Sequence, residues 1–233
     1  MIYKKAILLI GSPKGIKSSS ASLGSYLLSK LEKYDITGEK IHLHSEIDSE
    51  AKRNLFLDKI KTGDLIILTA PLYVDTLPAK VIKALSLIAE EKKKLYSDDI
   101  KSAKNQSFVA VVNCGFPEAE QNKTALKVYK EFAKEAKFEY LGGISVGMGG
   151  AISGQSLSEM RGMAKNLIEG LELAADEIVK NRQVSEKVYK KISKPLISQK
   201  WLYTLIGNFS WRFQALKNGV YRKINDKPYH KKN

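Results

Sequence analysis

The chain has 233 residues, of which 43% are hydrophobic, and it carries a formal net charge of +14. This length suits one sizeable domain with a hydrophobic core, or one domain plus an appendage. A single cysteine, Cys114, excludes a disulfide framework and a cysteine-rich metal site. No stretch is long and apolar enough to span a bilayer, and the apolar run after Lys4 and Lys5 has strand length without a signal-peptide cleavage site, so we expect a cytoplasmic protein.

The positive charge is concentrated towards the C-terminus. Residues 180–233 contain 14 Lys or Arg and 2 Asp or Glu, a net charge of +12, which leaves +2 for residues 1–179. A nearly neutral body and a strongly basic tail need separate explanations. We therefore expect a domain over residues 1–180 and a basic, aromatic-rich, helical extension over residues 181–233.

Apolar runs of strand length alternate with amphipathic helical patterns along the body. The strands are predicted at Ile2–Ile10, Glu39–His44, Asp64–Ala70, Ser107–Asn113 and Glu139–Val146. The helices are predicted at Ser22–Tyr34, Ser49–Lys61, Pro78–Tyr96, Glu118–Ala136 and Gln155–Lys180. This alternation predicts an α/β three-layer sandwich, in which helices cover both faces of a five-stranded parallel sheet. The expected strand order is 2-1-3-4-5, with ligands at the carboxyl ends of the strands.

The first strand leads into a loop, Gly11–Ser22, that is rich in Gly, Ser and Lys and that opens a helix. A helix N-terminus offers unpaired backbone N–H groups and partial positive charge, which together bind phosphate. Ser12, Ser18, Ser19 and Ser20 add hydroxyl donors, and Lys14 adds charge. A solvated loop with a serine N-cap remains an equal alternative.

The same loop nearly matches the nucleoside-triphosphate motif G-x-x-x-x-G-K-[ST]. However, Ile16 stands where the second glycine is required, because a side chain there would hinder the backbone cradle. Neither the third nor the fourth strand ends in the aspartate that such enzymes use for magnesium. We therefore do not expect a nucleoside triphosphatase.

Two further loops follow the predicted central strands. Ala70–Pro78 places Pro71, Leu72, Tyr73 and Val74 where a polar loop is usual, and two prolines stiffen it. Asn113–Glu118 contains Asn113, Cys114, Gly115 and Phe116. Apolar, glycine-containing loops beside a phosphate site suit a flat aromatic ligand with a phosphate tail, such as FMN. The alternatives are local packing of Tyr73 and of a small buried cysteine.

The three loops together resemble the flavodoxin-like NADPH-dependent FMN reductase family over about residues 1–180. The resemblance rests on Gly11-Ser-Pro-Lys with Ser18-Ser-Ser-Ala-Ser-Leu23, on Pro71-Leu-Tyr-Val-Asp-Thr-Leu-Pro-Ala79 and on Asn113-Cys-Gly-Phe-Pro-Glu118. It implies that Ser12, Lys14, Ser18, Ser19 and Ser20 face the FMN phosphate. It also implies that Pro71, Leu72, Tyr73 and Val74 line one side of the flavin ring, and Asn113, Cys114, Gly115 and Phe116 the other.

One pair of histidines is a candidate metal site. His42 and His44 lie two positions apart, on one face of the predicted edge strand. With no third ligand nearby, we expect two solvated histidines and no metal site.

The tail after Lys180 interleaves lysines and arginines with tyrosine, tryptophan and phenylalanine. Three interpretations remain open: short helices that dock on the body or a second subunit, an interfacial helix on an anionic membrane through residues 185–233, and a nucleic-acid site, which we do not expect. A homodimer is expected, and the protein is peripheral to the membrane if the second interpretation holds.

The leading functional hypothesis is an oxidoreductase that transfers hydride from NAD(P)H through bound FMN to a quinone, flavin, metal or protein acceptor. The cofactor supplies the chemistry, so we assign no catalytic side chain. Two alternatives remain. One is a flavodoxin-type electron carrier without NAD(P)H activity, and the other is a non-catalytic binding module that acts through the basic tail.

Overall fold

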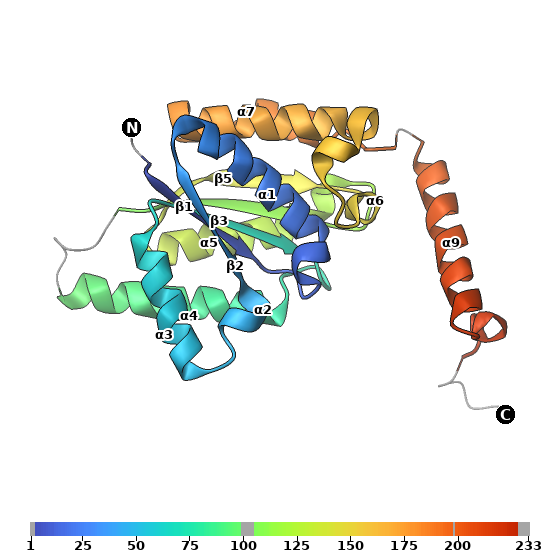
Figure 1. The fold of residues 1–233 in the computed structure, drawn as a ribbon, viewed down its shortest axis with the longest axis horizontal. Helices are drawn as coiled ribbons and strands as arrows, with labels where there is room; N and C mark the ends of the chain where they lie inside the picture. Colours follow the sequence, from blue (N-terminus) through green and yellow to red (C-terminus); the bar gives the residue numbers. More distant parts are fainter. Residues whose placement is uncertain (1–2, 99–104, 198, 228–233) are drawn as a thin grey trace. The chain divides into compact units, whose positions relative to one another are not determined.

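The computed structural model describes residues 3–98, 105–197 and 199–227 (Figure 1). The chain divides into two compact units, residues 1–196 and residues 197–233. The two are described separately below.

The first unit is built on a five-stranded parallel sheet in the order β2-β1-β3-β4-β5. The strands are β1 (Lys5–Ile10), β2 (Thr37–His42), β3 (Leu65–Pro71), β4 (Ser107–Asn113) and β5 (Glu139–Val146). The predicted number, direction and order of the strands are thereby confirmed. All of β4 and all but the last residue of β3 are buried, which explains why these strands are continuous apolar runs.

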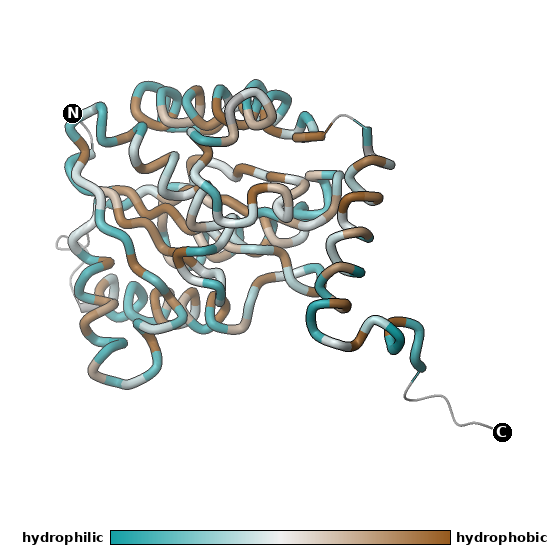
Figure 2. Tube along the Cα trace, turned by 45° about the vertical axis from the view of Figure 1, so that its right-hand side comes forward, coloured by the Kyte–Doolittle hydropathy of each residue, from teal (hydrophilic) through white to brown (hydrophobic). Residues whose placement is uncertain are grey.

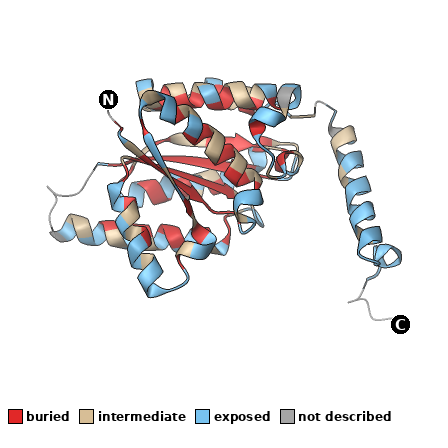
Figure 3. Ribbon diagram, viewed as in Figure 1, coloured by how far each residue is buried: buried red, intermediate tan, exposed pale blue. Residues whose placement is uncertain are grey.

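Helices cover both faces of the sheet (Figure 1). Ala6, Leu8 and Ile10 of β1 belong to one core, with α1 (Ser19–Leu31) and α7 (Lys165–Asn181). Ile7 and Leu9 point to the other core, with α3 (Glu50–Thr62), α4 (Ala79–Asp98) and α5 (Lys123–Glu135). Burial concentrates in the strands and on the inner sides of these helices (Figure 3). The three-layer sandwich is confirmed.

Three of the five predicted helices begin more than one residue away from the expected start, and α3 and α4 begin one residue later than expected. α1 begins at Ser19, because Ser18 caps it. The turn η3 (Ala119–Asn122) precedes α5. The long helix predicted from Gln155 begins only at Lys165, after α6 (Gly149–Ile152), η4 (Leu157–Glu159) and η5 (Arg161–Ala164).

The second strand ends two residues earlier than predicted. His42 is its last residue, and α2 (Leu43–Glu46) contains His44. The two histidines therefore do not share a strand face, and that expectation was wrong. Among the described residues no group of three or more His, Cys, Asp or Glu side chains is placed to hold a metal ion.

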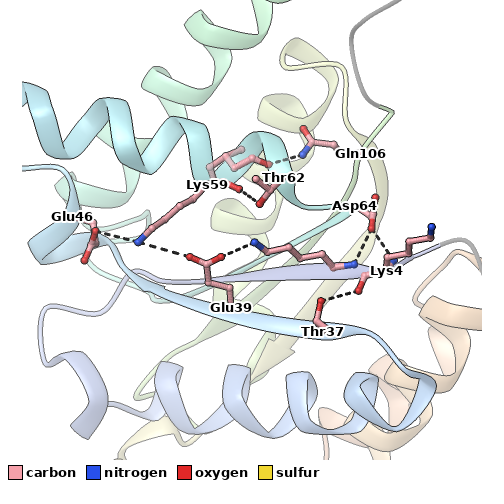
Figure 4. A network of polar contacts seen from close by, with 10 residues as sticks. Lys4, Thr37, Glu39, Glu46, Lys59, Thr62, Asp64 and Gln106 are labelled. Carbon is pink, nitrogen blue, oxygen red and sulfur yellow. Dashed lines mark hydrogen bonds and ion pairs between the residues drawn. The ribbon is translucent and has the colours of Figure 1, made fainter.

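Polar contacts fasten the amino-terminal edge of the sheet (Figure 4). Oδ2 of Asp64 accepts hydrogen bonds from the backbone N–H groups of Lys4 and Lys5, at 2.7 and 2.8 Å. Nε2 of Gln106 donates to the carbonyl oxygens of Ile60 and Gly63, at 2.7 and 2.8 Å. These bonds join three strands and α3 at the edge opposite the predicted site.

The first unit extends beyond residue 180, where the sequence predicts its end. α8 (Glu186–Ile192) buries Val188 and Ile192 in the core beneath α7. Both carboxylate oxygens of Glu177 bond to Ser185, the N-cap of α8, at 2.7 and 2.8 Å. The first unit therefore ends at Leu196.

The second unit contains α9 (Lys200–Lys217) and the single turn η6 (Tyr221–Lys223). Figure 2 shows hydrophobic and hydrophilic residues alternating along α9. Among the described residues, no helix has the length and apolar character needed to cross a membrane. Residues 198 and 228–233 of the predicted extension, like Ile2 of the first predicted strand, lie outside the described residues.

Candidate functional site at the carboxyl edge of the sheet

The loop between β1 and α1 packs closely against β3 and α4 where it leaves the sheet. The backbone N–H of Gly11 donates to the carbonyl of Thr69 at 2.7 Å. A Cβ atom at Gly11 would lie 2.4 Å from Cγ2 of Val81, so a side chain there would clash with α4. Gly15 has φ +58°, which favours glycine, and a Cβ there would meet nothing within 4 Å. The backbone of the loop is therefore surrounded by other residues at Gly11 and has free space beside it at Gly15.

The serines of this loop are already engaged within the protein. The hydroxyl of Ser18 donates to Gly15 O at 2.6 Å and accepts from Ala21 N at 3.1 Å, as an N-cap does. The hydroxyl of Ser19 donates to Gly149 O at 2.6 Å, and that of Ser20 to Oδ1 of Asn113 at 2.7 Å. The hydroxyls of Ser19 and Ser20 therefore tie α1 to two other segments at the same edge, and that of Ser18 bonds within its own loop.

The start of α1 still offers donors. Ser18 satisfies the N–H groups of Ala21 and Ser22. The N–H groups of Ser19 and Ser20 occupy the first two helical positions, which have no carbonyl partner within a helix. Lys14 is exposed nearby, and Ser12 is buried with its Oγ 3.4 Å from the N–H of Lys14. A phosphate here would meet backbone N–H groups and lysine charge.

The loop after β3 is a tight turn with exposed apolar residues. Tyr73 and Thr76 exchange two backbone hydrogen bonds, at 2.9 and 3.0 Å. Val74 and Asp75 between them have φ of +47° and +59°. A β-branched residue in this region is strained, and such strain concentrates at functional sites. Val74 is 97% exposed and Tyr73 is 42% exposed, so the turn presents apolar side chains to solvent.

Pro71 and Leu72, at the base of this turn, are half-buried. The N–H of Leu72 donates to the carbonyl of Asn113 at 2.8 Å, which holds the turn beside the end of β4. The predicted ring-lining residues of this loop thus divide into a fixed base and an exposed tip.

The loop after β4 divides in the same way. Cys114 is buried, its Sγ lies 3.7 Å from Phe116 O and 3.6 Å from Glu118 O, and burial raises the pKa of the thiol. A raised pKa disfavours the thiolate, so this cysteine suits packing better than nucleophilic chemistry. Phe116 is 53% exposed, and a Cβ at Gly115 would meet nothing within 4 Å.

Asn113 connects the loops. Its side chain accepts from Ser20, and its backbone carbonyl accepts from Leu72. A Cβ at Gly149 would lie 2.8 Å from Nδ2 of Asn113, so α6 approaches closely as well. Asn113 is itself buried, which makes it a junction of four segments.

The chain is similar to known proteins in its structure and not in its sequence. No family model matches the sequence, and no curated protein sequence matches it. Among solved structures, a protein described as a flavone reductase aligns with a TM-score of 0.55 at 10% identity, over 97% of this chain and 100% of that one. An FMN-dependent NADH-azoreductase from Bacillus anthracis, in complex with FMN, aligns with a TM-score of 0.52 at 16% identity, over 76% of this chain and 100% of that one.

A flavodoxin from Streptococcus pneumoniae TIGR4 aligns with a TM-score of 0.50 at 14% identity, over 76% of this chain and 99% of that one. The fold is flavodoxin-like. At these identities the likeness concerns the architecture, which agrees with the strand order 2-1-3-4-5.

The segment after β5, residues 147–154, completes this flavodoxin-like edge. It contains α6, and the carbonyl of Gly149 in α6 accepts a hydrogen bond from the hydroxyl of Ser19 in α1. Gly154 has φ +78°, and a Cβ there would lie 2.5 Å from the carbonyl oxygen of Lys17. The run of glycines between 147 and 154 was the available signal, because closely packed backbones require glycine.

A cavity of about 590 Å³ lies beside α1 and is lined in part by Ile16 and Ser22 of the first loop. Ser25, Tyr26 and Lys30 of α1 line it, together with Lys40 and His42 of β2. Nζ of Lys30 lies 2.7 Å from Oε1 of Glu172, so that charge is already paired. The cavity has no residue of the apolar loop tips among its lining.

Proposed function

We propose that the protein is an FMN-dependent oxidoreductase that accepts hydride from NAD(P)H and passes electrons to a quinone, a free flavin, a metal or a protein. One observation carries the proposal. Tyr73, Val74 and Phe116 are exposed apolar side chains on two neighbouring loop tips, beside the open start of α1. The flavodoxin-like fold and the FMN named for the azoreductase support it.

The predicted ring-lining residues suit FMN, but the predicted phosphate contacts through serine hydroxyls do not. The exposed tips suit a flat apolar ring, and the open space at Gly115 allows close approach of a ligand to the backbone. The phosphate would be held by the N–H groups of Ser19 and Ser20 and by Lys14, since the serine hydroxyls are engaged. Bound FMN would supply the hydride chemistry, and the chain would orient it and exclude water.

The absorbance spectrum of the purified protein, with and without added FMN, tests cofactor binding. We expect flavin absorbance that stays with the protein after gel filtration. Phe116→Ala should weaken FMN binding about tenfold, because that side chain would lose its buried contact with the ring. Leu55→Ala is the matched control, since Leu55 is 54% exposed on α3, and its FMN affinity should be unchanged.

NAD(P)H oxidation by the FMN-loaded protein tests the reaction. Anaerobic addition of NADH or NADPH should bleach the flavin within the dead time of manual mixing, and a quinone should restore it. A protein that neither retains nor binds FMN would contradict the whole proposal. Flavin that binds but is not reduced would support the electron-carrier alternative instead.

A further inference from the structure

Helix α9 presents an apolar sector that its own unit leaves uncovered. Its members recur at intervals of three and four residues, so they share one side of the helix. They are Trp201, Leu205, Ile206, Phe209, Phe213 and Leu216, with exposed fractions between 51% and 72%. Figure 3 draws α9 as exposed along most of its length.

The rest of the second unit contacts a different side of α9. Trp211, which is itself 77% exposed, Ala215 and Ile224, the residue after the turn η6, line a cavity of about 560 Å³ on that side. Trp211 follows Phe209 by two positions, which is about 200° around the helix. The short C-terminal turn therefore packs away from the apolar sector, and the sector needs a partner outside this unit.

The charge of this unit indicates what that partner is. Residues 197–233 contain eight Lys or Arg and one Asp, half of the net charge of +14, and α9 itself contains no acidic residue. The first unit carries the other half, so neither the body nor a second copy of the tail complements this charge. An anionic surface does, by about 1 kcal/mol per basic residue that lies near it.

We infer that α9 is an interfacial helix that binds anionic phospholipid membranes, with the apolar sector inserted among the acyl chains. The apolar residues supply the hydrophobic gain, and the basic residues of α9 and η6 contact the headgroups. Arg212 lies at the border between the apolar sector and the cavity side, and its long side chain can extend to the headgroups while its methylene stem stays in the apolar layer. No helix is apolar enough to cross the bilayer among the described residues, so α9 lies along the surface.

Flotation of the full-length protein with lipid vesicles tests this inference. We expect binding to vesicles of phosphatidylcholine that contain about 30% phosphatidylglycerol, and at least tenfold weaker binding to pure phosphatidylcholine. Raising the salt to about 0.5 M should weaken the binding, because the headgroup attraction is screened. Tryptophan fluorescence should shift to shorter wavelength on binding, since Trp201 enters an apolar layer.

Substitutions on the two sides of α9 distinguish insertion of the apolar sector from non-specific adsorption to the vesicles. Phe209→Ser and Phe213→Ser should each weaken binding about tenfold or more, because each removes a buried phenyl ring. Trp211→Ser is the matched control, since it deletes an aromatic residue outside the sector, and its binding should stay within about twofold of wild type. Lys223→Gln should weaken binding to anionic vesicles several-fold and leave the residual binding to neutral vesicles unchanged.

Three outcomes would overturn the inference. The first is no binding to anionic vesicles by a protein whose first unit unfolds cooperatively. The second is an equal loss for Trp211→Ser and Phe209→Ser. The third is a dimer or a nucleic-acid complex that depends on Phe209 and Phe213 while vesicle binding is absent, which would assign the sector to a second copy or to nucleic acid.

Discussion

Ser20 and Asn113 are 93 positions apart in the chain, yet their buried side chains share a hydrogen bond of 2.7 Å. The resemblance to the FMN reductase family implies that both contact the ligand. The structure gives their polar atoms to each other, so they shape the site before any ligand arrives. Lys14, which is exposed, keeps its charge available. Neighbouring residues of one motif therefore have different roles.

Ser20→Ala should lower the free energy of unfolding by about 1–3 kcal/mol, because Oδ1 of buried Asn113 loses its donor. Ser22→Ala is the control, since the Ser22 hydroxyl is half-buried and makes a longer bond of 3.3 Å to Ser18 O. Chemical denaturation measures both. Lys14→Gln should show the reverse pattern, with unchanged stability and several-fold weaker FMN binding. An unchanged stability of Ser20→Ala would contradict this assignment.

Lys92 makes stability depend on pH at the other edge of the sheet. Its ammonium group is buried, donates to Gln106 at 2.8 Å and lies 4.2 Å from the ring centroid of Phe138. Burial lowers its pKa to about 8 from 10.5. Between these values the unfolded chain binds more protons than the folded chain, so the free energy of unfolding should rise with pH.

Lys92→Met should remove this contribution. Near neutral pH the variant avoids a buried charge but leaves Oε1 of buried Gln106 without its donor, so the two effects oppose each other. The pH dependence isolates the charge: relative to wild type, the variant should become less stable as the pH rises from about 8 to about 10.5. Chemical denaturation of both proteins across this pH range measures their free energies of unfolding. In the difference between the two, the contributions of the other titrating groups cancel. A difference that does not change with pH would contradict the lowered pKa.

At the scale of elements, the turn between β3 and α4 combines strain with exposure. Two consecutive residues with positive φ close it, although Val74 is β-branched and favours extended backbone. A stability argument alone would place Asn there, and would not place a valine that is 97% exposed. Strained, exposed apolar residues at a sheet edge are consistent with a binding role.

Val74→Asn should raise the free energy of unfolding by about 1 kcal/mol, since asparagine tolerates the left-handed region. It should also weaken FMN binding if the turn contacts the ring. Leu55→Asn is a suitable control, because Leu55 is exposed on α3 and has no strain to relieve. A loss of stability at Val74→Asn would contradict the strain argument.

At the scale of the whole molecule, the boundary between the two units separates a packed body from a basic appendage. α8 belongs to the body, since a Cβ at Gly170 of α7 would lie 2.3 Å from Cγ1 of Ile192. The body therefore contains some of the basic residues that the sequence assigns to the extension. The expected homodimer stays a prediction.

A chain ending at Leu196 should unfold at the same temperature as the full-length protein. A chain ending at Lys180 should lose about 3–6 kcal/mol, because Val188 and Ile192 no longer cover the core. Thermal unfolding followed by circular dichroism measures both. Equal melting temperatures for the two shortened chains would place the boundary at residue 180 instead.

The sequence by itself determined the elements and their order in the sheet, and it predicted the candidate site at the carboxyl edge. These follow from local patterns: apolar runs make buried strands, and alternating βα units allow few topologies. The tertiary structure alone decided that the hydroxyls of Ser18, Ser19 and Ser20 are engaged, that Cys114 is buried, that the first unit continues to Leu196 and that the apolar sector of α9 is exposed. These depend on contacts between distant segments, which the spacing of residues along the chain does not encode.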